Sequence, residues 1–417
     1  MLLTKKIKLN VTEQDAATLE FMQSKSRGLY NWWVMKLRNG ERWPGWRAAK
    51  KTLQASKQHD PELKQVYGKL LHEVYFRLED AMKAFFRRVE NGERPGFPRV
   101  RPRHCFFTLV YPAMYLKREN NILILPTGGK GKKNKHYANI RAELTEVPPE
   151  GYKEVAISRD ARGHYFASFS YPASEHEPQM GGVVAFDLGI KTLAAGVTDQ
   201  GRRYHIGGFK GGRWYNKQLD KLRKKRAKCQ KKSRRYLRLS KVYQRVSEKK
   251  RNKQRDSLHK ASHLIAAKLV ERTVVIGDLS QRQMAMRERA KEKPNRFKNR
   301  AVFNDWGCYA FTQMLAYKCQ LYGKELVKLD ERNTSKTCSR CGHMQDMPLW
   351  KRTYRCENCG LVMDRDDNSA DNILTRFLAR RGPHTSLGEC GVLSEDQNGV
   401  EVTQASCPIQ RPQLKWW

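Results

Sequence analysis

The sequence is short of acidic residues and of long apolar runs. Its 417 residues include 82 Lys and Arg but only 42 Asp and Glu, which gives a formal net charge of +40 at pH 7. Such a charge destabilises a compact chain by self-repulsion unless a polyanion neutralises it. An anionic membrane would require an apolar span or an amphipathic anchor, and a mean hydropathy of −0.78 without a long apolar run offers neither. We therefore expect nucleic acid as the partner and no membrane.

Two further absences concern the location of the protein. Residues 1–6 lack the apolar stretch of a signal peptide. Four of the ten cysteines fall into two close pairs and the rest are scattered, which is unlike a disulfide framework. These features predict a protein of the reducing cytoplasm.

The two cysteine pairs predict a zinc site. Cys338/Cys341 and Cys356/Cys359 are C-x-x-C pairs about 14 residues apart, each followed by a glycine that suits a tight metal-binding turn. Four thiolates leave no open position for substrate or water, so the Zn²⁺ should be structural and the chemistry should lie elsewhere. His343 follows closely, but the filled shell makes it a surface residue.

Strand and helix patterns divide the chain at a polar linker, residues 172–182. Before it, a strand pattern at residues 6–11 is followed by helical periodicity from Thr12 to about residue 93, and strand patterns return up to residue 171. This order suggests a β-barrel interrupted by a helical lobe. After the linker, strands alternate with helices, which predicts an α/β sheet with parallel neighbours. The tail after Arg381 has no periodicity, and we expect it to be disordered.

Basic residues gather in two segments. Residues 213–260 have few acids, unlike a solvated helix that interleaves both signs, so direct phosphate contact is expected. Arginines on the extended run near residue 100 suit backbone contacts, with a solvated basic strand edge as the alternative. The candidate nucleic-acid-binding residues are Lys221, Arg223, Lys224, Lys225 and Arg226, with Arg99, Arg101 and Arg103.

Two aspartates stand where a metal-dependent nuclease needs carboxylates. Asp187 ends a buried strand, so its side chain should project from the edge of the sheet where ligands bind. Asp366 follows the cysteine pairs and precedes a predicted helix. Cleavage with two Mg²⁺ ions requires several such oxygen ligands to converge. Neither residue is diagnostic alone, because Asp187 also suits a turn and Asp366 also suits a helix N-cap.

Together, these segments resemble the TnpB family of transposon-encoded, RNA-guided DNA nucleases, relatives of type V CRISPR effectors. Residues 186–194 (FDLGIKTLA) and 364–373 (DRDDNSADNI) resemble its RuvC motifs, and residues 334–342 (TSKTCSRCG) its zinc ribbon. Residues 96–100 (GFPRV) resemble the start of its wedge barrel. The resemblance covers nearly all of the chain except the tail.

Membership implies a multidomain fold of the α/β and β classes. A wedge β-barrel (1–12 and 96–180) would be interrupted by a helical recognition lobe (13–95). An RNase H-like RuvC nuclease (181–337 and 361–381) would follow, with an inserted zinc ribbon (338–360) and a disordered tail (382–417). The implied activity is Mg²⁺-dependent DNA cleavage. A guide RNA from the transposon end would pair with target double-stranded DNA beside a short motif, and a prokaryotic, nucleoid-associated monomer is expected.

One position departs from the family. Many members carry a Glu in a V-V-x-E-D-L strand, and here the stretch 274–279 reads V-V-I-G-D-L, with Gly277 in its place. The nuclease is then inactive, or Asp278 substitutes, or another carboxylate does. Asp278 should point to the opposite face of the sheet.

Glu331 is the better candidate because it ends the next predicted strand, which should lie about 4.8 Å from that of Gly277 if the two are direct neighbours. Some TnpB-like proteins and their Fanzor relatives similarly pair a Gly-Asp motif with a Glu before the T-S-x-T-C segment. The expected catalytic set is Asp187, Glu331 and Asp366. A surface salt bridge with Arg332 is the alternative role for Glu331.

A second hypothesis is a nuclease-inactive, RNA-guided DNA-binding protein that acts as a repressor or targeting factor. It shares every binding feature with the first hypothesis, and only the carboxylate set separates the two. A transposase in its own right is a weaker third hypothesis, because no Tyr or Ser recombinase constellation is apparent.

Overall fold

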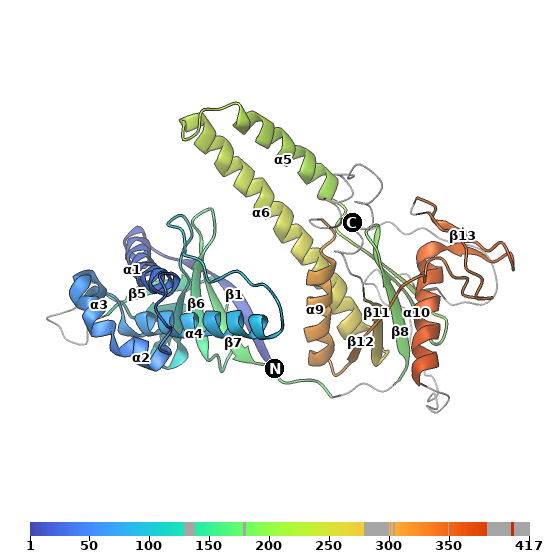
Figure 1. The fold of residues 1–417 in the computed structure, drawn as a ribbon, viewed down its shortest axis with the longest axis horizontal. Coiled ribbons are helices and arrows are strands. Elements are labelled where there is room, and N and C mark those ends of the chain that lie inside the picture. Colours follow the sequence, from blue (N-terminus) through green and yellow to red (C-terminus); the bar gives the residue numbers. More distant parts are fainter. Residues whose placement is uncertain are drawn as a thin grey trace. The chain divides into compact units, whose positions relative to one another are not determined.

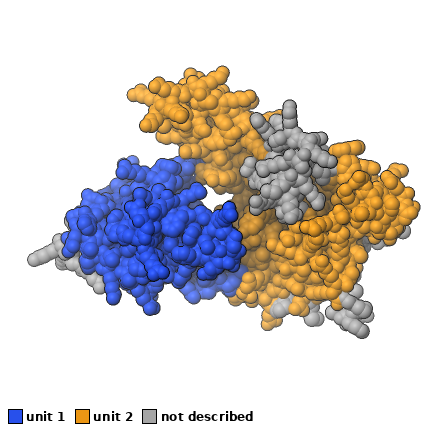
Figure 2. All heavy atoms as spheres, in the orientation of Figure 1, with its two compact units in different colours: residues 1–173 blue, residues 174–417 orange. Residues whose placement is uncertain are grey.

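The structure is a computed structural model that describes residues 1–128, 138–177, 181–278, 300, 302, 305–348, 350–381 and 402–403. It divides the chain into two compact units, residues 1–173 and 174–417 (Figure 2). In the described ranges, no helix has the length and apolar character needed to cross a bilayer.

The first unit contains a seven-stranded antiparallel sheet in the order β2-β6-β7-β1-β5-β4-β3. Its strands are β1 (Leu2–Asn10), β2 (Leu109–Pro112), β3 (Lys117–Glu119), β4 (Ile122–Leu125), β5 (Ile140–Leu144), β6 (Glu154–Arg159) and β7 (Tyr165–Pro172). The N-terminal strand lies inside the sheet and pairs with β7 from Leu2 to Leu9. Within the described residues no pairing joins the outer strands β2 and β3, so closure into a barrel remains a prediction.

Helices occupy most of the chain from Glu13 to Glu90, as the periodicity predicted. They are α1 (Glu13–Arg38), α2 (Trp46–Lys51), α3 (Leu53–His59), the 3₁₀ turn η1 (Pro61–Gln65) and α4 (Gly68–Glu90); a second 3₁₀ turn, η2 (Ala113–Tyr115), follows β2. Thr12 caps α1 by accepting a hydrogen bond from the Asp15 backbone N–H, which confirms the predicted helix start. Leu71 and Tyr75 of α4 share one core with Ile7 and Phe169 of the sheet.

The second unit contains a mixed sheet in the order β12-β11-β8-β9-β10-β15. Its strands are β8 (Val183–Leu188), β9 (Thr192–Thr198), β10 (Arg203–Gly207), β11 (Thr273–Gly277), β12 (Glu325–Leu329) and β15 (Val402–Thr403). Strands β8, β11 and β12 are parallel neighbours, which confirms the predicted parallel α/β arrangement. From the tail, the structure describes β15 alone, paired with β10; the remaining tail residues, for which disorder was expected, lie outside the described residues.

Helices cover both faces of this sheet (Figure 1). Helices α6 (Arg234–His263) and α9 (Cys308–Leu321) lie on one face, and α10 (Arg365–Arg381) lies on the other. Phe186 packs in the α6/α9 core, whereas Ala185 packs with Ile373 of α10. Because side chains alternate along a strand, Asp187 shares the α10 face with Ala185.

Two smaller parts complete the second unit. Helix α5 (Gly212–Ala227) and α6 pack as a hairpin that extends past the edge of the sheet (Figure 1), and α6 continues into a π-helical turn, η4 (Leu264–Lys268). Strands β13 (Thr353–Arg355) and β14 (Val362–Asp364) form a two-stranded sheet between β12 and α10 in the chain. This sheet belongs to the cysteine-containing segment.

Candidate functional site

The four paired cysteines form one metal-binding cluster. The Sγ atoms of Cys338 and Cys359 are 3.6 Å apart, as are those of Cys341 and Cys356, and all four lie within 4.8 Å of one another. Four thiolates at about 2.3 Å from a tetrahedral Zn²⁺ would be about 3.8 Å apart, so the geometry fits that ion. His343 is exposed, as expected, and lies outside this cluster.

Both cysteine pairs adopt the same turn. The backbone N–H of Gly342 donates to the Cys338 carbonyl at 3.0 Å, and that of Gly360 donates to the Cys356 carbonyl at 3.1 Å. The two glycines have φ angles of +74° and +70°, which residues with a side chain rarely adopt. The glycines noted in the sequence are therefore required by the knuckle turns.

Three adjacent strands bring the predicted carboxylates toward the α10 face. Asp187 lies on β8, Gly277 ends β11, and Glu331 follows β12 by two residues. In the parallel registers, Ile276 pairs with Phe186, and Gly277 pairs with Leu329. Glu331 must therefore reach across β11 to approach Asp187, over two strand spacings of about 4.8 Å each.

The side chain of Glu331 lies directly over Gly277. A Cβ atom built at position 277 would be 2.9 Å from Glu331 Cδ and 3.1 Å from its Cβ, and closer still to Oε2. A residue with a side chain would thus collide with the carboxyl group. The absence of a side chain at position 277 opens the path along which Glu331 points toward Asp187.

Asp278 is placed differently. Its neighbour Ile276 packs in the α6/α9 core, so the parity of the strand turns Asp278 toward the face opposite Asp187. Asp278 is exposed, and its backbone N–H donates to the Leu329 carbonyl at 2.6 Å. The arrangement favours Glu331 over Asp278 as the substitute for the missing strand carboxylate.

The acidic site disfavours its own negative charge. Burial, together with the nearby Asp187, Asp278 and Asp330, raises the pKa of Glu331 to about 8. Burial, together with Asp366, raises the pKa of Asp187 to about 7. Oxygen Oε2 of Glu331 is buried without a hydrogen-bond partner among the described residues. Repelling carboxylates with an unsatisfied buried oxygen are the donor set that a hard cation would stabilise.

Asp366 lies in the first turn of α10, where only 5% of its surface is exposed. Its Oδ2 is 2.6 Å from Nη2 of Arg352, and its Oδ1 is 3.2 Å from Nη2 of Arg365. The backbone N–H of Asp366 donates to Oδ1 of Asp364 at 2.8 Å, so Asp364 performs the capping role considered for Asp366. Each oxygen of the Asp366 carboxylate therefore forms an ion pair with a guanidinium group.

The three candidate carboxylates are neighbours but do not form a closed metal cage. Across the described ranges, the cysteines are the only group of three or more His, Cys, Asp or Glu side chains whose ligand atoms all lie within 4.8 Å. Sequence reasoning missed Arg352 and Arg365. Arg365 is next to Asp366 in the sequence, and this adjacency could have indicated the ion pair. Arg352 lies between the two cysteine pairs, and nothing in the sequence indicated its contact with Asp366.

The basic run of α5 has two roles. Lys221, Lys224 and Lys225 are exposed to solvent. Nη2 of Arg223 donates to the Tyr243 hydroxyl of α6 at 3.2 Å. The guanidinium of Arg226 lies 4.9 Å and 5.7 Å from two ring centroids of α6, those of Tyr243 and Tyr236. The two arginines thus help to join the hairpin, and the three lysines are available to a partner.

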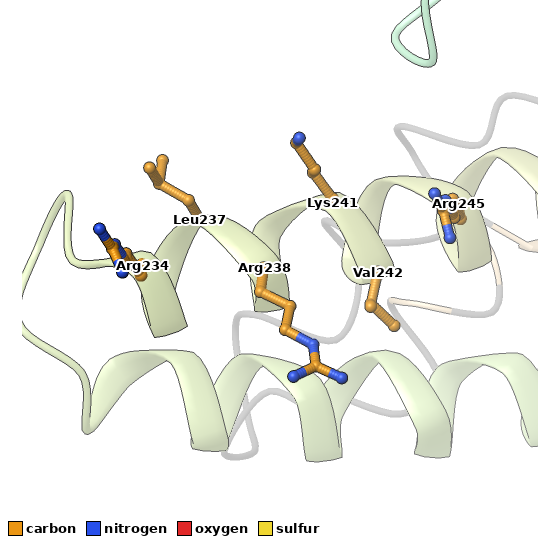
Figure 3. A pocket seen from close by; sticks show the side chains of 6 residues that line it. All are labelled: Arg234, Leu237, Arg238, Lys241, Val242 and Arg245. Carbon is orange, nitrogen blue, oxygen red and sulfur yellow. The ribbon is translucent and has the colours of Figure 1, made fainter.

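Helix α6 borders a shallow hollow of about 540 Å³ (Figure 3). Four exposed cations and two apolar side chains line it: Arg234, Leu237, Arg238, Lys241, Val242 and Arg245. These cations belong to the basic segment that the sequence marked for phosphate contact, but they were not singled out there. The lining suits a polyanion with partly apolar character, such as nucleic acid.

The exposed Arg99, Arg101 and Arg103 lie on an extended segment. Side chains of helix α1 form hydrogen bonds with the backbone of this segment. Asn31 Nδ2 donates to the Arg101 carbonyl at 2.9 Å, and the Arg101 N–H donates to Asn31 Oδ1 at 2.6 Å. Nη1 of Arg27 donates to the Arg103 carbonyl at 3.2 Å. The backbone is fixed and the arginine side chains remain exposed.

Comparisons with known proteins identify two family models, a similar fold and several relatives. One family model, described as "Probable transposase", matches residues 162–288, and another, described as "Cas12f1-like, TNB domain", matches residues 309–373. The structure is similar to the protein in "Cryo-EM structure of the Cas12f1-sgRNA-target DNA complex", with a TM-score of 0.60 and 15% identity over 87% of this chain and 83% of that chain. The fold of this chain is therefore similar to that of the Cas12f1 protein in that complex.

Curated relatives match more locally. "TnpB-like protein L79" of Acanthamoeba polyphaga mimivirus is 35% identical over 136 residues, which are 33% of this chain and 24% of that protein. A "Putative RNA-guided DNA endonuclease" of Streptomyces pristinaespiralis is 31% identical over 273 residues, 64% of this chain and 61% of that protein. The chain thus spans about a quarter of the viral relative and less than two thirds of the bacterial one. Together with the two family models, these relatives support a member of the TnpB family.

Proposed function

We propose that the protein is an RNA-guided DNA endonuclease encoded by a transposable element, which cleaves target DNA beside a short motif. The observation that carries the proposal is the Glu331 carboxyl group lying over Gly277, on the face of the sheet that bears Asp187. Loss of the strand carboxylate alone would suggest a lost activity. A replacement carboxylate that fits into the vacated space favours a retained one.

Asp187, Glu331 and Asp366 would hold the catalytic metal, and their oxygen donors suit Mg²⁺. When bound, two Mg²⁺ ions supply an activated water and stabilise the leaving 3′ oxygen. The fold would bring Asp187 of β8, Glu331 after β12 and Asp366 of α10 to one face of the sheet. It would also limit the contact of these carboxylates with water. Arg352, whose Nη2 donates to Oδ2 of Asp366, would compete with a metal for that oxygen. The four cysteines would hold a structural Zn²⁺.

The proposed partners are a guide RNA from the transposon end and target double-stranded DNA. The similar Cas12f1 structure is a complex with guide RNA and target DNA. In this chain, the exposed lysines of α5 and the cations along α6 would contact phosphates. The exposed Arg99, Arg101 and Arg103 would contact the nucleic-acid backbone. Residues 1–12 and 96–180 would form the wedge, and residues 13–95 the recognition lobe.

Plasmid cleavage with the co-purified RNA tests the proposal. With Mg²⁺ and an intact target, Asp187→Ala and Glu331→Ala should abolish cleavage, and the matched variant Asp278→Ala should cleave like the wild type. If Glu331→Ala cleaves at the wild-type rate, the relocated carboxylate is wrong. Sequencing of the bound RNA provides a second test, because a specific transposon-end transcript supports guided action and random RNA argues against it.

The ion pairs of Asp366 favour a second candidate, a nuclease-inactive protein that binds DNA through its guide. Both oxygens of this carboxylate face arginines, and the three carboxylates do not form a closed cage. Such a protein would retain target binding and show no Mg²⁺-dependent cleavage. The cleavage assay, combined with a target-binding assay on the same RNA complex, therefore separates the two functions.

A further inference from the structure

Helix α10 fastens the loop that carries Glu331. Three polar side chains take part, Asn368, Asn372 and Arg376, and each follows the previous one by four residues. Residues at this spacing lie on one face of a helix. Helix α10, which carries Asp366 in its first turn, therefore presents a row of hydrogen-bond donors to the loop between β12 and the first cysteine of the zinc site.

The two asparagines hold the later half of this loop. Asn372 Nδ2 donates to the carbonyls of Thr334 and Thr337, both at 2.8 Å, and Asn368 Nδ2 donates to the same carbonyls at 3.3 Å and 2.7 Å. Asn368 is fully buried, and 8% of Asn372 is exposed. Each carbonyl thus accepts from both amides, so the loss of one asparagine removes one of its two hydrogen bonds, and a typical hydrogen bond contributes about 0.5–1.5 kcal/mol.

Thr334 connects this contact to Glu331. Its backbone N–H and its Oγ1 donate to the Glu331 carbonyl at 3.2 Å and 2.9 Å. Arg376 holds the loop on the other side, where its Nη1 donates to the carbonyls of Asp330 at 3.1 Å and Arg332 at 2.8 Å. The backbone of Glu331 is thus fixed on both sides by one helix, while its side chain rests on Gly277.

From these contacts we infer that Asn368, Asn372 and Arg376 are positioning residues. They set the position of the Glu331 carboxylate relative to Asp366, which lies on the same helix as the three of them. The inference rests on the proposed role of Glu331 as a metal ligand. Asn368 also accepts the Ser339 N–H at 3.0 Å and so serves the cysteine module directly. Asn372 and Arg376 are therefore the cleaner probes.

The test measures metal binding by the full-length chain, with Mn²⁺ as a calorimetric probe of the Mg²⁺ site. Asn372→Ala and Arg376→Ala should each weaken Mn²⁺ binding by about 10- to 100-fold, the usual effect of losing a group that orients a ligand. Zinc content should stay at the wild-type level. Arg376→Lys should restore much of the affinity because it keeps a cationic donor. Arg380→Ala, an exposed arginine one turn further along α10, is the matched control.

The outcomes distinguish this inference from the proposed function. If the wild type binds no Mn²⁺, or Glu331→Ala leaves Mn²⁺ affinity unchanged, the metal-ligand role of Glu331 fails. If Glu331→Ala weakens binding but Asn372→Ala and Arg376→Ala do not, the positioning role is wrong.

A double variant, Glu331→Ala with Arg376→Ala, provides the last arm. It should bind Mn²⁺ no more weakly than Glu331→Ala alone, because Arg376 acts through Glu331. A further loss in the double variant would mean that Arg376 acts independently and would overturn the inference. The Arg376 arms remain decisive even if Asn372→Ala disturbs folding, because Arg376 is partly exposed.

Discussion

Glu331 and Gly277 form a complementary pair, because the Glu331 carboxyl group occupies the space that a side chain at position 277 would need. A Cβ at that position would be 2.9 Å from Glu331 Cδ. The two sequence features are thereby linked, since the glycine without a side chain and the glutamate beyond the next strand are two halves of one arrangement. Either half alone would leave the proposed site incomplete.

The first prediction concerns the empty space at position 277. Gly277→Ala should displace the Glu331 carboxylate, and a misplacement of about 1 Å can reduce a catalysed rate by roughly 100-fold. Plasmid cleavage with the RNA complex measures the effect. Gly207→Ala is the matched control, because a Cβ at Gly207 would meet no atom within 4 Å. Wild-type cleavage by Gly277→Ala would argue against a catalytic Glu331.

A second prediction restores the carboxylate at the strand position. Gly277→Glu alone should cleave poorly, because the new side chain and Glu331 compete for one space. When Gly277→Glu is combined with Glu331→Ala, the competition is removed and one carboxylate remains on the same face. The double variant should therefore cleave faster than either single variant. A double variant that is slower than both would contradict the exchange of roles.

The third prediction follows from the raised pKa of Glu331. Its ordinary pKa of 4.5 rises to about 8 in the folded protein, chiefly because of burial. Between these values the folded state keeps a proton that the unfolded chain has released, so the free energy of unfolding falls as pH rises from about 4.5 to 8. Glu331→Gln has no charge to bury. In Mg²⁺-free buffer, its melting temperature should fall less between pH 5 and pH 8 than that of the wild type.

Thermal unfolding at both pH values, monitored by circular dichroism, measures this difference, which should be on the order of a few degrees. Chelators are left out so that the zinc site is not stripped. The exposed Glu93→Gln is the control, because an exposed carboxylate has no buried charge to lose. If the melting temperatures of Glu331→Gln and the wild type change equally with pH, the pKa of Glu331 is not raised by folding and the prediction is wrong.

Patterns local in sequence were predicted well, and contacts between distant segments were not. A strand was predicted just before Glu331, and β12 (Glu325–Leu329) lies there, because apolar runs bounded by turns are local signals. The proximity of Glu331 to the strand of Gly277 followed from the order of neighbouring parallel strands. By contrast, Arg352 reaches Asp366 only because the cysteine module folds back on α10, which no spacing in the sequence reveals.

The basic run of α5 illustrates the same limit. Its charge predicted phosphate contact for all five residues alike. The structure separates them, because Arg223 and Arg226 face tyrosines of α6, and that depends on how the two helices pack. Net charge identifies a class of partner, whereas the helix packing decides which cations are available to it.

The fourth prediction concerns the zinc site. Cys356→Ser should lower zinc content and the melting temperature, because a small module with little core depends on its metal to fold. It should also lower cleavage, because Arg352 and the loop of Glu331 both adjoin this module. Cys105→Ser, an exposed cysteine of the first unit, is the control. Full cleavage by zinc-free Cys356→Ser would show that the module does not support the acidic site.

The last prediction separates the two kinds of cation on α5. Replacing Lys221, Lys224 and Lys225 with Ala should lower the slope of log affinity against log salt by about 2 to 3, since each phosphate contact contributes about 0.7 to 0.9. Arg226→Ala should instead lower the melting temperature, because its guanidinium packs against two tyrosine rings of α6. Filter binding of the co-purified RNA over a range of salt, with thermal unfolding of each variant, measures both effects. An unchanged salt slope in the triple variant would place the phosphate contacts elsewhere, with the cations along α6 as the next residues to test.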